Sequence, residues 1–256
     1  MTILSSLVDQ GREYDLYSSI VNTEVAISGT TTLTSTAFGK NHIITGGADY
    51  TVTLPAASGN SGKIIGFRVT GSALFTIKAS GSELIDGENE RVMWKDESAV
   101  LLCDGSGWTK VAGKSIPFVI NGEKTSSQSA GGNVNTKLIY ETVTEPKSGI
   151  FNSSTFTVPR RSNWNMTVNL VADSGGSAHR VLAAYYINGN LDRLLWTGHN
   201  SSTSAATFSG GCVSKLYNKN ELDKNDEFEF WFRINLPTTI DGNPTNNFSI
   251  TEIPTW

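Results

Sequence analysis

The stretch Tyr50–Val69, YTVTLPAASGNSGKIIGFRV, decides the fold class of this sequence. Its first five residues alternate large apolar side chains with threonine, the period of a half-buried strand. Pro55 has no N–H to give to a sheet and ends that strand, and Ser58–Gly62 is rich in turn-forming residues. Apolar alternation resumes over Ile64–Val69. The stretch therefore predicts two strands joined as a hairpin, with both glycines of the polar run forming the loop rather than holding a ligand.

The rest of the chain has the same character. Its 256 residues are rich in Gly, Ser, Thr and Asn, and no 10-residue helical pattern stands out, which favours an all-β fold with many turns. The 20 basic residues are scattered and the net charge is −4, so we expect no nucleic-acid partner. No apolar run approaches the roughly 18 residues that span a bilayer, so we expect no membrane insertion. Met1–Gly11 lacks the features of a secretory signal.

Composition divides the chain into four segments. We predict a leader over residues 1–26, a first β-domain over 27–112, a linker over 113–135 and a second β-domain over 136–256. The predicted linker contains Pro117, an Asn-Gly turn and a Ser/Gln/Gly-rich run with little to bury. In the leader, apolar residues spaced i,i+4 are compatible with a short helical turn. The leader is either a docking segment or a strand that completes the first domain, and both interpretations remain open.

In the first domain, strands and turns recur every 8–12 residues, which is typical of a compact β-barrel or sandwich. Three of its segments are TVTLPAASGNSGKIIGFRV, FTIKASGSELIDG and ESAVLLCDGSGW. In this order they resemble a module that recurs in bacteriophage tail fibres and related virion fibres, and the resemblance covers roughly residues 40–112. It rests on a TLP strand with a glycine loop, an IDG turn, and a strand that ends in DG-x-x-W. The resemblance implies a structural fibre module.

The second domain carries the strongest strand pattern of the chain, Phe228–Ile234. Its segments FTVPRRSNWNMTVNLVAD, VLAAYYINGN, LDKNDEFEFWFRIN and NNFSITEI resemble the trimeric jelly-roll heads of the complement and tumour-necrosis-factor superfamily. Ser162-Asn163-Trp164 replaces the usual Gly-x-Tyr of that family, and Lys224-Asn225-Asp226 stands where Gly-Asp is common. The resemblance implies a C-terminal jelly-roll head and a homotrimer.

No constellation of residues points to catalysis. Gly113-Lys114-Ser115 lacks the first glycine of a phosphate loop, whose place is taken by Trp108. The three histidines are isolated and there is no C-x-x-C, so we expect no metal site, no cofactor and no enzyme. Asp223, Asp226 and Glu227 could offer oxygen ligands to calcium, but their spacing is not that of an EF-hand loop.

Candidate binding residues gather around the segment LDRLLWTGHN, which we interpret as a polar loop after an apolar patch. Aromatic faces and polar side chains of this kind suit stacking on sugar rings and bonding to hydroxyls. The candidates are Asn188, Arg193, Trp196, His199 and Asn200. The alternative is that Trp196 packs beneath its own hairpin.

Three further side chains leave alternatives open. Cys103 and Cys212 lie in different apolar segments, and two buried free thiols are favoured over a disulfide. Trp231 alternates with the core-facing phenylalanines of its strand, so it faces either a neighbouring subunit or a second sheet.

The two resemblances together imply a virion protein, made in the cytoplasm of a host bacterium. Its leader would attach to other virion proteins and its head would contact a host-surface glycan or protein. This describes a phage tail fibre or receptor-binding adhesin. The chain is short for a long tail fibre, so a capsid decoration or head-fibre protein is the alternative. A glycan-degrading fibre enzyme ranks third, because no long repetitive β-helix is visible.

Overall fold

The computed structural model is all-β, as predicted, and divides into two compact units at Ile116–Pro117. It describes residues 6–9, 12–15, 23–147, 149–173, 179–200, 207–235, 238–240, 242 and 246–255, with the backbone alone in some strands. The one helical element among these residues is a 3-10 turn, η1 (Ser35–Ala37). The described part of the chain contains no helix with the length and apolarity needed to cross a membrane.

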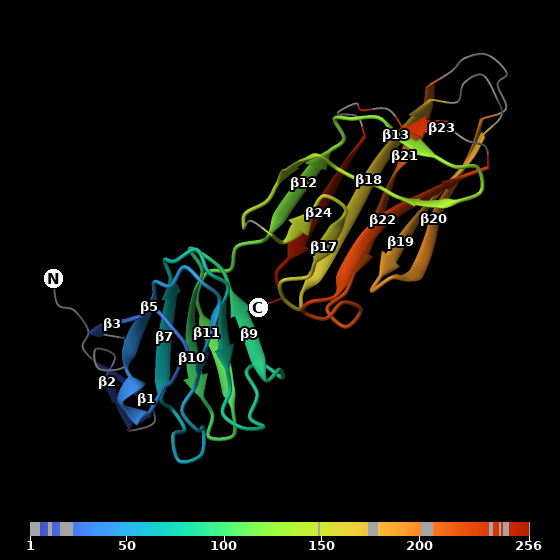
Figure 1. Ribbon diagram of the computed structural model, residues 1–256. Coiled ribbons are helices and arrows are strands. Elements are labelled where there is room, and N and C mark those ends of the chain that lie inside the picture. Colours follow the sequence, from blue (N-terminus) through green and yellow to red (C-terminus); the bar gives the residue numbers. More distant parts are fainter. Residues whose placement is uncertain are drawn as a thin grey trace. The chain divides into compact units, whose positions relative to one another are not determined.

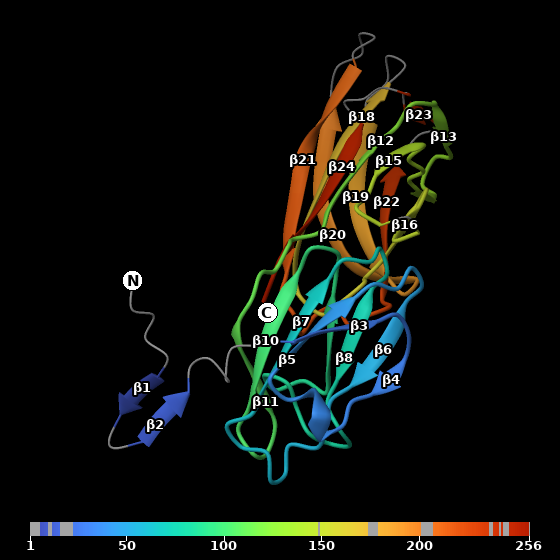
Figure 2. The same cartoon turned by 90° about the vertical axis from the view of Figure 1, so that its left-hand side faces the viewer.

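Besides an N-terminal two-stranded hairpin, the first unit contains two larger sheets, and from residue 23 to residue 78 successive strands alternate between them (Figures 1 and 2). One has the order β11-β10-β7-β5-β3 and the other β4-β6-β8-β9. The strands are β3 (Thr23–Ile27), β4 (Thr31–Thr32), β5 (Lys40–Ile44), β6 (Tyr50–Thr53), β7 (Ile64–Val69), β8 (Phe75–Lys78), β9 (Glu90–Met93), β10 (Ser98–Cys103) and β11 (Trp108–Ala112). From β3 to β8 each strand is parallel to its neighbour in the sheet, so the chain winds as a short coil between two faces.

This winding corrects the predicted hairpin at Tyr50–Val69. β6 and β7 lie in different sheets and do not pair, because both edges of β6 are taken by its parallel neighbours β4 and β8. After β6 the chain crosses the core, and Leu54 and Ala57 are buried on the way. The loop role of Gly59 and Gly62 is confirmed by their φ values of 76° and 81°, a region that favours glycine.

A repeated corner holds successive turns of the coil together. Three strands end in the same way, with Ile27-Ser28-Gly29, Ile44-Thr45-Gly46 and Val69-Thr70-Gly71. The Thr45 N–H donates to the Ile27 carbonyl at 2.9 Å, and the Thr70 N–H donates to the Ile44 carbonyl at 2.8 Å. Both threonine hydroxyls donate to the same carbonyls. Each corner is therefore bonded to the one before it.

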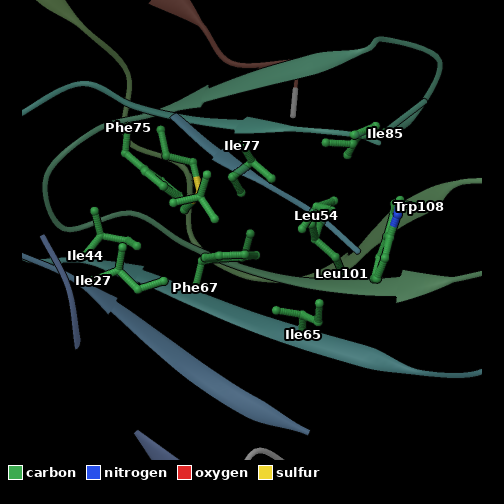
Figure 3. Close-up of a cluster of buried hydrophobic side chains, with 14 of the residues drawn as sticks. Ile27, Ile44, Leu54, Ile65, Phe67, Phe75, Ile77, Ile85, Leu101 and Trp108 are labelled. Atoms are coloured by element: carbon green, nitrogen blue, oxygen red, sulfur yellow. The ribbon is translucent and has the colours of Figure 1, made fainter. Parts of the chain in front are cut away.

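Stacked side chains fill the space between the two sheets (Figure 3). Ile27, Ile44 and Val69 occupy matching positions on three parallel strands and are buried. The rings of Phe67 and Phe75 face each other across the core, 5.6 Å apart. Cys103 is a free, buried thiol, as favoured from the sequence, and burial raises its pKa. The side chain of Cys212 lies outside the described residues.

His42 is a buried titratable side chain beside this stack. It is 2% exposed, its Nδ1 lies 3.2 Å from the Gly66 carbonyl, and its ring lies 5.4 Å from that of Phe67. Burial lowers the pKa of His42 below its usual 6.5, and the nearby Lys40 acts in the same direction. The folded unit therefore favours the neutral imidazole.

We predict that acid destabilises the first unit through this histidine. Since the folded pKa lies below the unfolded one, the stabilisation is fully present above the unfolded pKa and is lost as the pH falls below it. Urea unfolding at about pH 7.5 and pH 5.5 should show a smaller loss of stability in His42→Gln, which keeps a hydrogen-bond donor, than in the wild type. An equal loss in both proteins would contradict the prediction.

The N-terminal segment lacks the predicted helical turn, and its last residues form a strand that belongs to the first domain, which was one of the two alternatives. β1 (Ser6–Asp9) and β2 (Arg12–Asp15) pair as an antiparallel hairpin, so residues 6–9 are extended rather than helical. The predicted boundary at residue 26 cuts through β3, which pairs in parallel with β5. Its last residue, Ile27, is buried in the core, which is why the chain becomes a strand before the predicted domain start. Docking by the preceding residues stays a prediction.

The predicted linker over 113–135 is also corrected, because most of it belongs to the second unit. β12 (Val119–Glu123) pairs with β24 (Asn247–Ile253), and its Ile120 is fully buried. The glycine of the Asn-Gly turn signal, Gly122, instead lies inside β12 beneath the ring of Phe248, where a side chain would clash. The turn-forming residues of this segment gave no signal for β12, because its partner β24 lies near the other end of the sequence.

The second unit consists of two antiparallel sheets. The remaining strands are β13 (Gln128–Ala130), β14 (Asn135–Lys137), β15 (Thr142–Thr144), β16 (Phe151–Asn152), β17 (Thr155–Thr157), β18 (Asn163–Asp173), β19 (His179–Ile187), β20 (Asn190–Asn200), β21 (Thr207–Tyr217), β22 (Glu227–Ile234) and β23 (Thr238–Ile240). One sheet contains the order β12-β24-β18-β21 and the other β17-β22-β19-β20. When these eight strands alone are numbered in chain order, the first sheet has the order one-eight-three-six and the second sheet has the order two-seven-four-five. This strand order is that of a jelly roll, as predicted.

Aromatic side chains dominate the core between these sheets. The phenylalanines of β22 are buried there, and Phe248 lies 4.7 Å from Tyr140 and 4.5 Å from Phe151 between ring centroids. The hydroxyl of Tyr140 is buried without a hydrogen-bond partner among the described residues. Burial raises the pKa of Tyr140 well above 10, so the hydroxyl stays neutral.

We predict that Tyr140→Phe stabilises the second unit by about 1 kcal/mol, because it removes a buried polar group that has lost its water. Tyr185→Phe is the matched control, since the Tyr185 hydroxyl donates to the Met166 carbonyl at 3.1 Å. That variant should instead lose about 1 kcal/mol. Denaturant unfolding measures both variants, and equal losses of stability would show that the Tyr140 hydroxyl is bonded in solution.

Candidate binding surfaces

The segment predicted as a binding loop is a strand. Residues 190–200 form β20, which pairs with β19 along its whole length, and the structure describes only the backbone of Arg193–Asn200. The pairing follows from the Asn188-Gly189 turn, whose two residues have φ values of 51° and 75°. This is the conformation of a two-residue hairpin turn, which leads the chain straight back along its partner. The polar composition of residues 197–200 therefore marks a strand end rather than a loop.

The five candidate residues do not come together at one place. Asn188 lies at the turn, whereas Asn200 pairs with His179 at the other end of the hairpin. A strand of this length separates them by about 30 Å. Asn188 is also engaged locally: its Nδ2 donates to Asp226 and its Oδ1 accepts from the Glu227 N–H, both at 2.8 Å. Asn188 thus has a structural role, and a binding role for Arg193, Trp196, His199 and Asn200 stays a prediction.

The acidic corner considered for calcium is occupied by protein contacts. Asp226 accepts from Asn188 and from the Asp223 N–H, at 2.8 and 2.7 Å. Asp223 forms an ion pair with Arg161 at 2.9 Å. Among the residues that the structure describes, no three His, Cys, Asp or Glu side chains are grouped so that they could hold a metal ion.

One outer face of the jelly roll is almost free of charge. It belongs to the sheet β15-β12-β24-β18-β21, and its residues alternate with buried ones and lie in register across the strands. Glu123, at the end of β12, is the one charged residue described there. The others are Val119, Asn121, Thr142, Thr144, Asn163, Asn165, Thr167, Asn169, Leu216, Asn247, Ser249, Thr251 and Ile253. We call this set the uncharged face.

The outer face of the opposite sheet is charged and carries Trp231. The Lys137 ammonium group of β14 forms an ion pair with the Glu229 carboxylate of β22. The Trp231 Nε1–H donates a hydrogen bond to the same carboxylate at 2.7 Å. The Trp231 ring lies 4.8 Å from that of Tyr186, at an angle of 36°. Within the described unit, the partner of Trp231 is thus a ring on its own sheet rather than a second sheet.

A pocket of about 290 Å³ lies in the first unit, where two turns highlighted by the sequence meet. It is lined by Ser82, Glu83, Leu84, Asp86 and Gly87 before and within the IDG turn, and by Asp104, Ser106, Gly107, Trp108 and Thr109 from the DG-x-x-W turn. The Trp108 N–H donates to the Leu84 carbonyl, and the Asp86 N–H donates to the Trp108 carbonyl, both at 2.9 Å. A side chain on Gly107 would approach the Leu84 carbonyl to 2.7 Å. These contacts hold the two turns side by side.

Carboxylates determine the charge of this pocket. Asp104 Oδ1 accepts from the N–H groups of Ser106 and Gly107, each at 2.7 Å. These bonds, that of Ser106 first, lower the pKa of Asp104, so this side chain is ionised at neutral pH. Asp86 Oδ2 accepts from the Lys110 N–H at 3.1 Å. None of the lining residues is basic, so the pocket disfavours anions.

No family model matches the sequence, and no curated protein matches it. Among solved structures, murine APRIL at pH 5.0 is 12% identical, covering 54% of this chain and 100% of that one, with a TM-score of 0.40. Eiger TNF from S. frugiperda is 10% identical, covering 54% and 92%, with a TM-score of 0.35. The VP2 subviral particle of infectious bursal disease virus is 9% identical, covering 65% and 45%, with a TM-score of 0.33. These scores are too low to carry an argument, and the jelly-roll assignment rests on strand order.

Proposed function

We propose that this chain is a structural, non-enzymatic fibre protein of a virion, assembled as a homotrimer. Its N-terminal segment attaches to the particle and its jelly-roll unit contacts the host surface. The sequence motifs support the virion setting, and the resemblance of the second domain supports three-fold assembly. The observation that carries the proposal is the uncharged face.

The uncharged face is suited to burial against other copies of the chain. Burying an ionised side chain requires a partner that compensates for lost hydration, whereas Asn, Ser and Thr need only hydrogen bonds. Protein interfaces are depleted in charge at their centre for the same reason. On the outer side of the opposite sheet Glu227 and Arg233 are exposed and Lys137 forms an ion pair with Glu229, so this side is suited to solvent.

A charge placed at the centre of the uncharged face should therefore dissociate the assembly. Ser249 pairs with Asn121 on one side and with Thr167 on the other. We expect Ser249→Lys to sediment as a monomer with unchanged far-UV circular dichroism. Thr157→Lys, on the outer side of the opposite sheet, is the control and should remain trimeric. Trimers in both variants would place the interface elsewhere.

Antibody-labelled electron microscopy of purified particles tests the virion role. Label at the tail supports a tail fibre or adhesin, and binding of the purified protein to host cells should follow. Label on the capsid would instead favour a decoration protein with a structural role. Particles without label would overturn the proposal.

A further inference from the structure

Three polar side chains form a row across one sheet of the jelly roll, where three neighbouring strands end. β12 lies between β15 and β24 (Figure 1), and its last residue pairs with the first residue of each of these strands. The same register, continued by one residue, sets Lys124 between Glu141 and Asn246. The Lys124 N–H donates to the Asn246 carbonyl at 2.9 Å, which shows that the pairing continues to this row.

The three side chains of this row belong to the inner side of the sheet. The neighbouring row, Glu123, Thr142 and Asn247, lies on the uncharged face, and successive side chains of a strand point to opposite faces. Lys124 is 1% exposed and Asn246 is fully buried, whereas the Glu141 side chain, 29% exposed, lies at the rim. Residues directly opposite each other on antiparallel strands have Cβ atoms about 5 Å apart, a distance that a lysine side chain can bridge.

The Lys124 ammonium group is held by acceptors at one edge of this row. Its Nζ donates to the Ile139 carbonyl at 3.1 Å and to Glu141 Oε1 at 3.3 Å. Glu141 Oε2 accepts from the Thr125 N–H at 2.8 Å. Burial acts to raise the pKa of Glu141, but the Thr125 N–H and the Lys124 charge outweigh it, so the pKa is lowered. Glu141 is therefore an ionised proton acceptor in contact with a buried amine.

Burial favours the transfer of a proton within this pair. An ammonium group that is 1% exposed has lost its hydration, and a buried ion pair recovers only part of that loss. If the proton moves from Lys124 to Glu141, both charges disappear. The product is a neutral amine, which is a nucleophile, next to the carboxamide of Asn246 on the neighbouring strand.

We propose that Lys124 and Asn246 become joined by an intramolecular isopeptide bond, with Glu141 as the proton carrier. Glu141 takes a proton from the lysine, and the neutral Nζ attacks Cγ of Asn246. The new nitrogen–carbon bond forms as the Cγ–Nδ2 bond breaks, and a second proton passes from Nζ to Nδ2, which leaves as ammonia. The proton on Glu141 departs with it as ammonium, so the reaction balances without an oxidant or a cofactor.

The bond would join the first strand of the second unit to its last. β12 and β24 stand at opposite ends of the unit in sequence, so the link closes a loop over almost all of the unit. A cross-link over a long loop restricts the unfolded chain most strongly. It also prevents the two end strands from separating when the chain is pulled. This inference goes beyond the fibre role and does not depend on trimer formation.

The intact mass of the denatured wild-type protein tests the proposal directly. We expect it to be lower than the mass calculated from the sequence by one molecule of ammonia. Trypsin should then release a branched peptide, in which residues 115–137, uncut at Lys124, are joined to residues 234–256. Tandem mass spectrometry of this peptide separates the link from the loss of ammonia within a single peptide.

Two variants test the role of the carboxylate. Glu141→Gln keeps the shape but removes the proton carrier, and it should retain the full mass of its sequence with the far-UV circular dichroism of the wild type. Glu229→Gln removes the partner of Lys137 on the outer side of the other sheet, and this matched control should remain linked. A wild-type mass equal to that of the sequence, ammonia loss without the branched peptide, or a linked Glu141→Gln would each overturn the proposal.

Discussion

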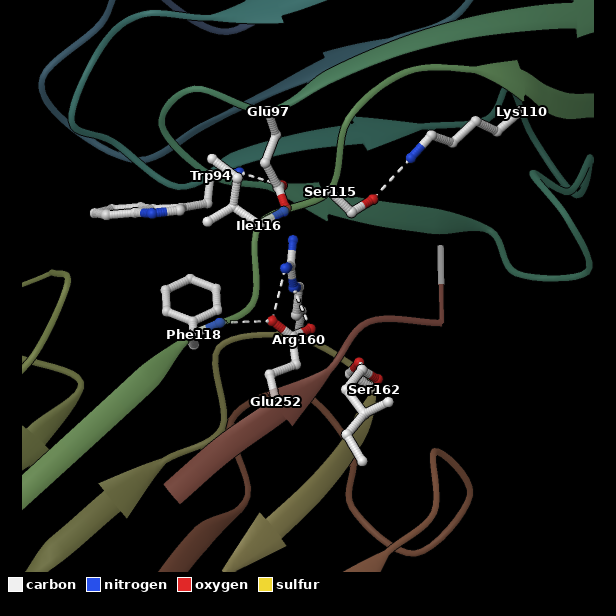
Figure 4. Close-up of polar contacts among 10 residues, drawn as sticks. Trp94, Glu97, Lys110, Ser115, Ile116, Phe118, Arg160, Ser162 and Glu252 are labelled. Atoms are coloured by element: carbon white, nitrogen blue, oxygen red, sulfur yellow. Dashed lines mark hydrogen bonds and ion pairs between the residues drawn. The ribbon is translucent and has the colours of Figure 1, made fainter. Parts of the chain in front are cut away.

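Replacing Glu252 by leucine is expected to reduce the unfolding free energy of the second unit by about 3–5 kcal/mol. Glu252 and Arg160 are 2% and 7% exposed and form a two-pronged ion pair, with nitrogen–oxygen distances of 2.6 and 2.7 Å (Figure 4). Glu252 Oε2 also accepts from the N–H of Phe118, the residue before β12, at 3.0 Å. Leucine keeps the volume but leaves a buried guanidinium without this carboxylate.

Two companion variants make the measurement decisive. Asp223→Ala removes the partner of the neighbouring Arg161, whose ion pair is exposed, and should cost less than about 1 kcal/mol. The double variant Arg160→Met/Glu252→Leu should recover most of the loss, because no uncompensated charge remains. Equal effects of Glu252→Leu and Asp223→Ala in chemical denaturation would show that the buried pair does not stabilise the fold.

Gly71→Ala is expected to destabilise the first unit by about 1–3 kcal/mol or more. A side chain at Gly71 would lie 2.2 Å from the Gly46 carbonyl oxygen and 2.8 Å from the Thr45 carbonyl carbon. Both are backbone atoms of the preceding corner, so neither can turn aside as a flexible side chain could. The clash falls where Gly71 and Thr70 bond to the Ile44 carbonyl, at 2.9 and 2.8 Å.

Gly47→Ala is the control for the corner, because it lies next to Gly46 yet has no atom within 4 Å of an added side chain. It should be neutral or slightly stabilising, since alanine reduces the freedom of the unfolded chain. Thermal unfolding of both variants separates crowding at the corner from a general effect of glycine replacement. A similar small change in both would contradict the stacked-corner description.

Strands were more predictable than their partners. The sequence predicts the strands Ile64–Val69 and Phe228–Ile234, and the structure places them at β7 and within β22, because alternation is a local signal. The same signal could not separate a hairpin from two strands in different sheets, and so Tyr50–Val69 was assigned the wrong pairing. The recurring Ile-Ser-Gly, Ile-Thr-Gly and Val-Thr-Gly corners could have revealed the coil.

Sites were harder to predict than strands. Residues 190–200 appeared polar enough for a loop, but pairing with β19 depends on the turn that precedes them. The IDG and DG-x-x-W turns were recognised separately, whereas their meeting depends on the bridge between Ile85 and Trp108. The uncharged face needed the register of five strands, which come from separate parts of the sequence. Local chemistry was visible in each case, and the tertiary arrangement that combines it was not.

The mass of the purified wild-type protein in solution tests the proposed fibre most directly. Multi-angle light scattering should give about 83 kDa, three chains of 27.6 kDa, and the value should persist on dilution. A mass of 27.6 kDa, that of a single chain, would contradict the homotrimer and with it the proposed role of the uncharged face.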